Sequence, residues 1–193
     1  MIKSTTMLTS AGRHIDLMGV RAKDIDFIEI GYSLSNIMRF TGHAQKDWSV
    51  AQHCLLMAEM VTRTAAPYAL LHDAHEAFSN DLSSPFKAAM AARIPGGDRA
   101  YRLLCDDFDA AIYAAAELIY PVPALIEAEI KEADQILCSA EQIAIMKDAV
   151  PEFDCGDLWK KVVEQPEEVV RHNWGNACQR LLPRFNLLKG DVA

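Results

Sequence analysis

The stretch Tyr68-Ala-Leu-Leu-His-Asp-Ala-His-Glu-Ala-Phe78 decides how this chain folds. It is apolar nearly all round a helix, carries His72, Asp73 and Glu76, and follows Pro67, which suits the first turn of a helix. This pattern is typical of a buried central helix. Burying an unpaired charge costs several kcal/mol, so the charged residues of this helix need partners. The stretch therefore predicts a helical core with a polar site inside it.

Helical spacing extends over most of the chain, and we expect an all-α fold. Ser49 followed by Gln52 forms a capping-box pattern, which starts a helix and puts His53 in its first turn. Residues 12–25 are the exception, because their apolar residues alternate and predict a short extended segment or hairpin. The remaining expected helices cover residues 26–40, 98–119 and 124–147, with a last one beginning near Pro166.

Composition excludes several classes of function. With 193 residues, of which 51% are hydrophobic, the chain can bury a sizeable core, and we expect residues 1–193 to form a single domain. The net charge of −8 argues against a nucleic-acid polymer as partner, whereas a small anionic substrate can meet a few cations in a cleft. The five scattered cysteines indicate reduced thiols. The sequence has no signal-peptide pattern and no long uncharged apolar run, so we expect a cytoplasmic protein with no membrane partner.

Four side chains form a candidate set of metal ligands: His53, His72, Asp73 and Asp134. Asp134 lies on an apolar stripe of its expected helix, between Ile130 and Leu137, where a carboxylate needs a partner. Two imidazole nitrogens and two carboxylate oxygens suit a divalent transition metal and leave coordination positions open for water and substrate. An isolated His-Asp pair is more often an ordinary hydrogen-bonded pair. Two histidines and two acids from three helices are compensated most simply by one divalent ion.

These residues stand in a pattern that resembles the HD-domain metal-dependent phosphohydrolases. The resemblance follows the order of that family and includes residues beside the ligands. The matching stretches are Ser49-Val-Ala-Gln-His53, Leu70-Leu-His-Asp-Ala-His-Glu-Ala77, Asp81 with Pro85 and Lys87, and Ala133-Asp134. Within the superfamily, the chain is most similar to bacterial 5'-deoxynucleotidases with their YfdR-like relatives, and to phage deoxyadenosine triphosphohydrolases. Residues 12–17 and 37–43 resemble the YfdR-like and phage members.

The resemblance implies an HD-domain helical bundle with one divalent metal at its centre. It leaves the metal open among manganese, cobalt, zinc, iron and nickel. The six histidines of the chain are too few for the dinuclear branches of the superfamily, which favours a single metal. The resemblance also implies a homo-oligomer, either a dimer or a larger assembly. The apolar segment 110–120 could contribute to such an interface, although it suits the core equally well.

Glu76 and Asp81 are the candidate catalytic residues. Glu76 stands one helical turn past His72, where it could orient or deprotonate an attacking water; the alternative is a clamp on His72 or Arg39. The resemblance gives Asp81 an active-site role, either holding a sugar hydroxyl or helping to protonate the leaving oxygen. Its alternative role is the cap of the next helix. His75 faces away from His72, which predicts an ordinary structural histidine.

Four residues are candidate substrate contacts: Arg39, His43, Trp48 and Lys87. The resemblance places Arg39, which stands near His43, and Lys87 close to the phosphate. There a guanidinium can bind paired oxygens and an ammonium adds a point charge. A salt-bridge role is the alternative for Arg39. Trp48 and Phe40 could stack on a base, although aromatic residues at helix boundaries are more often part of the core.

The sequence therefore predicts a phosphohydrolase that acts on deoxynucleotides. By resemblance, the first choice is a 5'-deoxynucleotidase that releases phosphate from dNMPs, and the alternative is a dNTP triphosphohydrolase that releases tripolyphosphate. The same metal and base serve both reactions, and the nearby cations Lys46, Lys87 and Arg93 do not separate them. A possibility from another class is a catalytically silent nucleotide-binding sensor, which the intact ligand set and Glu76 disfavour.

Overall fold

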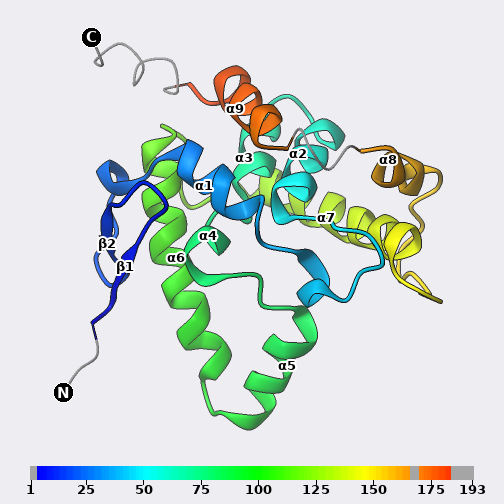
Figure 1. Cartoon of the computed structure of the whole chain (residues 1–193), viewed down its shortest axis with the longest axis horizontal. Coiled ribbons are helices and arrows are strands. Elements are labelled where there is room, and N and C mark those ends of the chain that lie inside the picture. Colours follow the sequence, from blue (N-terminus) through cyan, green and yellow to red (C-terminus); the bar gives the residue numbers. More distant parts are fainter. Residues whose placement is uncertain (1–3, 166–169, 184–193) are drawn as a thin grey trace.

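The computed structural model describes residues 4–165 and 170–183, and within them the prediction of an all-α fold is confirmed. Helices dominate, and a small two-stranded sheet stands near the N-terminus (Figure 1). The elements in chain order are β1 (Thr6–Leu8), β2 (His14–Asp16), η1 (Ala22–Asp24), α1 (Phe27–Leu34), η2 (Arg39–Gly42), α2 (Val50–Met60), α3 (Ala66–Leu71), α4 (Glu76–Ser79), α5 (Ser84–Arg93), α6 (Gly97–Ala115), α7 (Ala124–Ile145), α8 (Leu158–Glu164) and α9 (Val170–Leu181).

The core surrounds α2 and α3, which pack against each other and are buried over most of their surfaces. Helices α7 and α9 pack against both of them, α1 packs on α9, and α8 covers part of α7. The largest side chains of the core include Leu56, Leu70, Ile112 and Leu137, which are almost completely buried. Burying these apolar surfaces is the main force that holds the helices together. The central position of α2 and α3 brings their polar residues into the middle of the molecule.

The N-terminal hairpin confirms the expected extended segment. Strands β1 and β2 are antiparallel, with Thr6 opposite Asp16 and Leu8 opposite His14. The hairpin is tied to α1 by Glu29, which pairs with Arg13 and accepts a hydrogen bond from the Thr9 hydroxyl at 2.7 Å. The extended segment was expected within residues 12–25, but the hairpin begins earlier in the chain, because its first strand is Thr6–Leu8.

The expected helix over 26–40 is shorter in the structure. Asp26 caps α1 by accepting from the backbone N–H groups of Ile28 and Glu29, as predicted, but the helix ends at Leu34. Met38 is extended and pairs with Ser49, and the N–H of the following residue, Arg39, donates to the Trp48 carbonyl at 2.9 Å. This pairing places Arg39 beside the start of α2.

The expected continuous helix from Tyr68 to Phe78 is wrong. Helix α3 ends at Leu71, residues 72–75 form turns, and the short helix α4 begins at Glu76. Backbone bonds three residues apart replace the α-helical spacing, from Ala74 N–H to the Leu71 carbonyl and from Glu76 N–H to the Asp73 carbonyl, each at 3.0 Å. Tighter turns of this kind are common at helix ends and at functional sites. Periodicity cannot reveal such a break, because the apolar pattern continues through it.

The other boundaries agree closely with the sequence. The capping box of Ser49 and Gln52 is present, and the two long helices lie at 97–115 and 124–145. The expected helix start near Pro166 lies outside the described residues. Segment 110–120 supplies several core residues, so much of its apolar surface is used within the chain, while the oligomeric state stays a prediction. Among the described residues, no helix has the length and apolar character needed to cross a membrane.

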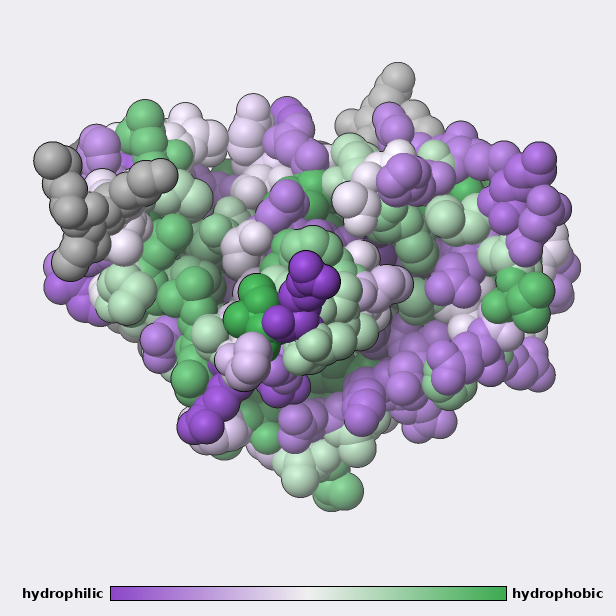
Figure 2. Space-filling model, turned by 90° about the horizontal axis from the view of Figure 1, so that it is seen from below, coloured by the Kyte–Doolittle hydropathy of each residue, from purple (hydrophilic) through white to green (hydrophobic). Residues whose placement is uncertain are grey.

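Helices α5 and α6 form an arm at one end of the molecule. They pack against each other, and no residue of α5 is buried. Figure 2 looks at this end and shows the surface projecting toward the viewer, with hydrophobic and hydrophilic residues intermixed on it. The first residues of α5 therefore stay accessible beside the polar centre of the molecule.

Gly31 allows α1 and α9 to approach closely. The indole ring of Trp174 on α9 crosses α1 at this position, and its Nε1–H donates to the Phe27 carbonyl at 2.8 Å. A Cβ at Gly31 would overlap the ring. Trp174 is 1% exposed and packed on all sides, so the ring has little room to move away.

We expect Gly31→Ala to lower the free energy of unfolding by about 1–3 kcal/mol through overpacking. The matched control is Gly175→Ala on α9, where the added Cβ would meet only Ile28 Cδ1 at 3.7 Å. The control should be neutral or more stable than the wild type by about 0.5–1 kcal/mol, because alanine favours a helix over glycine. Urea unfolding measures both effects. Equal midpoints for Gly31→Ala and the wild type would contradict the close packing.

Candidate metal centre

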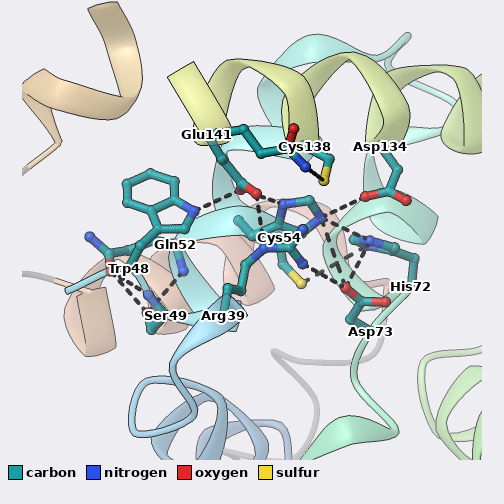
Figure 3. A network of polar contacts seen from close by, with 12 residues as sticks. Arg39, Trp48, Ser49, Gln52, Cys54, His72, Asp73, Asp134, Cys138 and Glu141 are labelled. Atoms are coloured by element: carbon teal, nitrogen blue, oxygen red, sulfur yellow. Dashed lines mark hydrogen bonds and ion pairs between the residues drawn. The ribbon is translucent and has the colours of Figure 1, made fainter. Parts of the chain in front are cut away.

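The structure brings the four predicted ligands together from three places in the fold. His53 lies on α2, His72 and Asp73 lie in the turn after α3, and Asp134 lies in the middle of α7. The Nε2 atoms of His53 and His72 are 3.2 Å apart. Asp134 Oδ1 is 3.1 Å from His53 Nε2, and Asp73 Oδ2 is 3.2 Å from His72 Nε2. In Figure 3 the two carboxylates lie around the imidazole of His72.

The outer nitrogen of each ring is already occupied. His72 Nδ1 is 2.8 Å from the Ala69 carbonyl, which can only accept, so this nitrogen carries a hydrogen. His53 Nδ1 is 2.7 Å from a carboxylate oxygen of Glu141, which also can only accept, so His53 Nδ1 carries a hydrogen as well. In the neutral rings, both Nε2 atoms then carry lone pairs, lie 3.2 Å apart and stand next to the two carboxylates. This donor set fits a divalent cation, and the group of His53, His72 and Asp134 could hold a metal ion.

The electrostatics of the site agree with this geometry. Burial disfavours the charged imidazolium of His72, but the neighbouring Asp73 and Cys54 together outweigh burial and raise the pKa of His72 well above its usual value. Burial also opposes ionisation of Asp73, but His72 and His53 hold its pKa well below the usual range. For Asp134, the contact with His53 overcomes burial and lowers the pKa. In the metal-free protein, protons thus provide positive charge that a cation could supply instead.

Arg39 lies between two carboxylates. Its Nε donates to Glu141 Oε2 at 2.9 Å, and its Nη1 is 3.6 Å from Asp73 Oδ2. Only 12% of its side chain is exposed. The salt-bridge alternative for Arg39 therefore holds in part, while the residue also lines the cavity next to the site.

A cavity of about 470 Å³ opens beside the ligands, and most of the other predicted site residues line it. It lies between η2, the start of α5 and the side of α7 that carries Asp134. The predicted residues on its wall are Arg39, His43, Asp73, Glu76, Asp81, Lys87 and Asp134. The arrangement thus joins the candidate catalytic acids and the candidate phosphate contacts to the candidate metal centre.

Glu76 is the acid of this cavity whose environment most favours the neutral form. It is 4% exposed, and its Oε2 has no hydrogen-bond partner among the described residues. Burial, together with repulsion from Asp73 and Asp81, raises the pKa of Glu76 to about 9. Burial is also the main reason why the pKa of Asp81 is raised. A strongly perturbed carboxyl group on a cavity wall is typical of a functional site.

Two other expectations concern residues that do not face the cavity. Trp48 was a candidate for stacking on a base, but it is 1% exposed and its indole N–H donates to Glu141 at 2.7 Å. A base cannot stack on a ring in that position, so Trp48 belongs to the core. His75 contacts Asp109 on α6 through Nδ1 at 3.2 Å, in agreement with the expected structural role.

Glu141 is the site residue that the sequence analysis missed. It is completely buried and contacts His53, Arg39 and Trp48. A signal for it exists, because Glu141 lies two helical turns after Asp134. The argument that singled out Asp134, a carboxylate on an apolar stripe, applies equally to Glu141.

Comparison with known proteins finds relatives whose sequences match the chain over most of their length. The uncharacterized protein YfdR of Escherichia coli (strain K12) is 33% identical over 182 residues, which cover 92% of each chain. The chain belongs to the YfdR family. An uncharacterized protein of Rhodobacter capsulatus is also 33% identical, over 150 residues that cover 72% of this chain and 73% of that protein. No family profile matches the chain. Membership of the YfdR family confirms part of the predicted resemblance but assigns no activity.

We expect divalent metal binding to release protons and to weaken as the pH falls. A ring with a raised pKa is protonated in the metal-free protein, and a metal must displace that proton. Calorimetric titration with zinc between pH 6 and 8, in buffers of different ionisation enthalpy, measures both effects. His172→Ala, which removes an exposed histidine on α9, is the control and should behave as the wild type. An affinity that does not change over this pH range would contradict the expectation.

Proposed function

We propose that this YfdR-family protein is a metal-dependent phosphohydrolase of the HD-domain superfamily that acts on deoxynucleotides. The substrates that we propose are 5'-deoxynucleoside monophosphates. The observation that carries the proposal is the shared cavity, in which Glu76 stands beside the candidate metal centre and near two cations, Arg39 and Lys87. Phosphoester hydrolysis needs a bound electrophile, a base and positive charge around the phosphate. The cavity contains candidates for all three.

The chain's own residues can divide the reaction between them. When bound, a divalent ion would polarise the phosphate and lower the pKa of a water molecule. Burial and the neighbouring acids favour the neutral form of Glu76, whereas the positive charge of a bound ion would favour its carboxylate. In that ionised form, Glu76 is placed to take the proton of the water as it attacks phosphorus. As the bond between phosphorus and the 5' oxygen breaks, that oxygen needs a proton, and Asp81, whose pKa is raised, is a candidate donor. The alternative for Asp81 is a hydrogen bond to the sugar.

The charge of the cavity favours a monophosphate. Its wall carries four acids, at positions 73, 76, 81 and 134, against the cations Arg39 and Lys87. Arg39 is already paired with Glu141. The charges of a divalent ion and of a phosphate monoester, which carries about −2, would cancel, so a bound monophosphate adds no net negative charge to this acidic wall. A triphosphate chain brings further negative charge and would need more cations than this wall offers.

Phe40 is the aromatic residue available to the nucleoside. It lines the cavity next to Arg39, whereas Trp48 does not. Its backbone is left-handed, with φ of 55°, as is that of Thr41, with φ of 56°. Bulky residues adopt this conformation at a cost, and such positions cluster at functional sites. The turn at residues 40–41 therefore supports a nucleoside-binding role for this side of the cavity.

Product analysis tests the proposed reaction directly. Protein stripped of metal and resupplied with manganese, cobalt or zinc is offered dAMP and dATP in parallel, together with the other deoxynucleotides. We expect phosphate from the monophosphate. Tripolyphosphate from dATP would transfer the assignment to the triphosphohydrolase. Tight nucleotide binding without any product would instead favour the silent sensor and overturn the enzyme.

We expect Glu76→Gln to reduce kcat by about 100-fold or more while metal binding is retained, because the amide keeps the shape of the side chain but cannot accept the proton. Glu132→Gln, on the exposed face of α7, is the matched control and should keep wild-type activity. Steady-state kinetics and metal analysis of the purified variants distinguish the two. Full activity in Glu76→Gln would exclude Glu76 as the base.

A further inference from the structure

Three N–H donors converge on the buried carboxylate of Glu141. Oε1 accepts from Trp48 Nε1 and from His53 Nδ1, each at 2.7 Å, and Oε2 accepts from Arg39 Nε at 2.9 Å. Figure 3 shows Glu141 reaching down from α7 toward Trp48 and Arg39. The partners come from α2 and from the segment that precedes it. One carboxylate therefore connects α7 both to α2 and to the segment that precedes α2.

This carboxylate is unusual because it is charged in the interior. Burial alone would favour the neutral acid, but Arg39 and His53 outweigh burial and lower the pKa of Glu141. Charged groups are retained inside a protein when hydrogen bonds and opposite charges compensate their lost hydration. Glu141 does not line the cavity, so it cannot touch a substrate there. Any contribution to binding or chemistry must pass through its three partners.

We propose that Glu141 is a positioning residue that serves the metal ligand His53 and the cavity cation Arg39 together. Through His53 Nδ1 it fixes the ring orientation and keeps the hydrogen on the outer nitrogen, so that Nε2 faces the other ligands. Through Arg39 Nε it fixes the plane of the guanidinium. This inference rests on the metal centre of the proposed function, and it adds a link between metal binding and phosphate binding.

The position of Arg39 shows what the link prevents. Its Nη1 is 3.6 Å from Asp73 Oδ2, which is longer than a good hydrogen bond, while its Nε is held by Glu141. Without the Glu141 carboxylate, the guanidinium is free to move onto Asp73 and form a closer pair. That pair would occupy a carboxylate oxygen needed by the metal and would turn the arginine away from the phosphate. Loss of Glu141 should thus weaken both functions.

The test is Glu141→Gln, which keeps the shape of the side chain but removes its charge and one of its two acceptor oxygens. We expect the affinity for zinc, measured by competition with a chelator, to fall about 10- to 100-fold, the usual effect of losing a carboxylate behind a histidine ligand. Ser139→Ala is the matched control: it removes a buried polar group from the same helix, one that accepts from the Phe153 N–H and contacts no ligand. The control should bind zinc as the wild type does.

Nuclear magnetic resonance supplies a readout that general destabilisation would not change. In the zinc-loaded wild type, we expect a His53 Nδ1–H proton shifted downfield by its carboxylate partner, and in Glu141→Gln this signal should lose that shift. In the metal-free wild type, the Arg39 Nε–H should exchange slowly with solvent. A zinc-loaded wild type with His53 protonated on Nε2 would overturn the proposal without any variant, which keeps the test valid if Glu141→Gln does not fold.

The outcomes separate the two proposals. Equal zinc affinity in Glu141→Gln and the wild type, or an equal loss in Ser139→Ala, would overturn the role of Glu141 and leave the metal centre standing. Failure of the wild type to bind zinc, manganese and cobalt would overturn the metal centre itself.

Trp48→Phe is a further variant, because it removes one of the three donors to Glu141 and leaves the contact between the carboxylate and His53 in place. We expect it to change zinc affinity by no more than about threefold, and a loss as large as that of Glu141→Gln would show that packing, not the contact with His53, sets the affinity.

Discussion

The concentration of carboxylates in the interior is the constraint on which the rest of this structure depends. Glu76 and Glu141 are buried, the side chain of Asp73 is 19% exposed, and Asp134 lies beside them with a side chain that is 43% exposed. Charged groups that are buried in a helical core lose much of their hydration. Such a group persists only with compensating positive charge or with a raised pKa. The protein uses both solutions. Arginine and histidine compensate three of the acids, and Glu76 has the raised pKa.

The turn after α3 makes this concentration possible. A continuous helix would place His72, Asp73 and Glu76 at fixed angles of about 100° per residue. The tighter turns at residues 72–75 change those angles and bring side chains from both sides of the break to the same cavity. The surrounding helices hold the turn in place, since Ala74 is completely buried and His75 contacts α6. The fold thus supports a local departure from regular helix at the position where chemistry is proposed.

The site has two layers with different tasks. The inner layer contains the candidate ligands and acids, and its carboxylates line the cavity. In the outer layer, Glu141 contacts His53 and Arg39, and the Ala69 carbonyl contacts His72. Trp48 belongs to this layer because it donates to Glu141. Orientation by such an outer layer is general in metal sites, because a ring that can rotate loses affinity for the ion. Buried groups of the core can therefore affect the chemistry of the cavity.

The sequence by itself determined the all-α class, the hairpin, the capping box at Ser49 and the four candidate ligands, because these follow from local spacing and from the cost of burying charge. Tertiary structure decided the rest. The break after Leu71 depends on contacts between distant helices, and the apolar pattern runs through it without a signal. The burial of Trp48 and the three contacts of Glu141 depend on α7 reaching the start of α2, about ninety residues away in the chain. Periodicity shows that a residue is inside, but only the packing of the helices decides which partner it meets there.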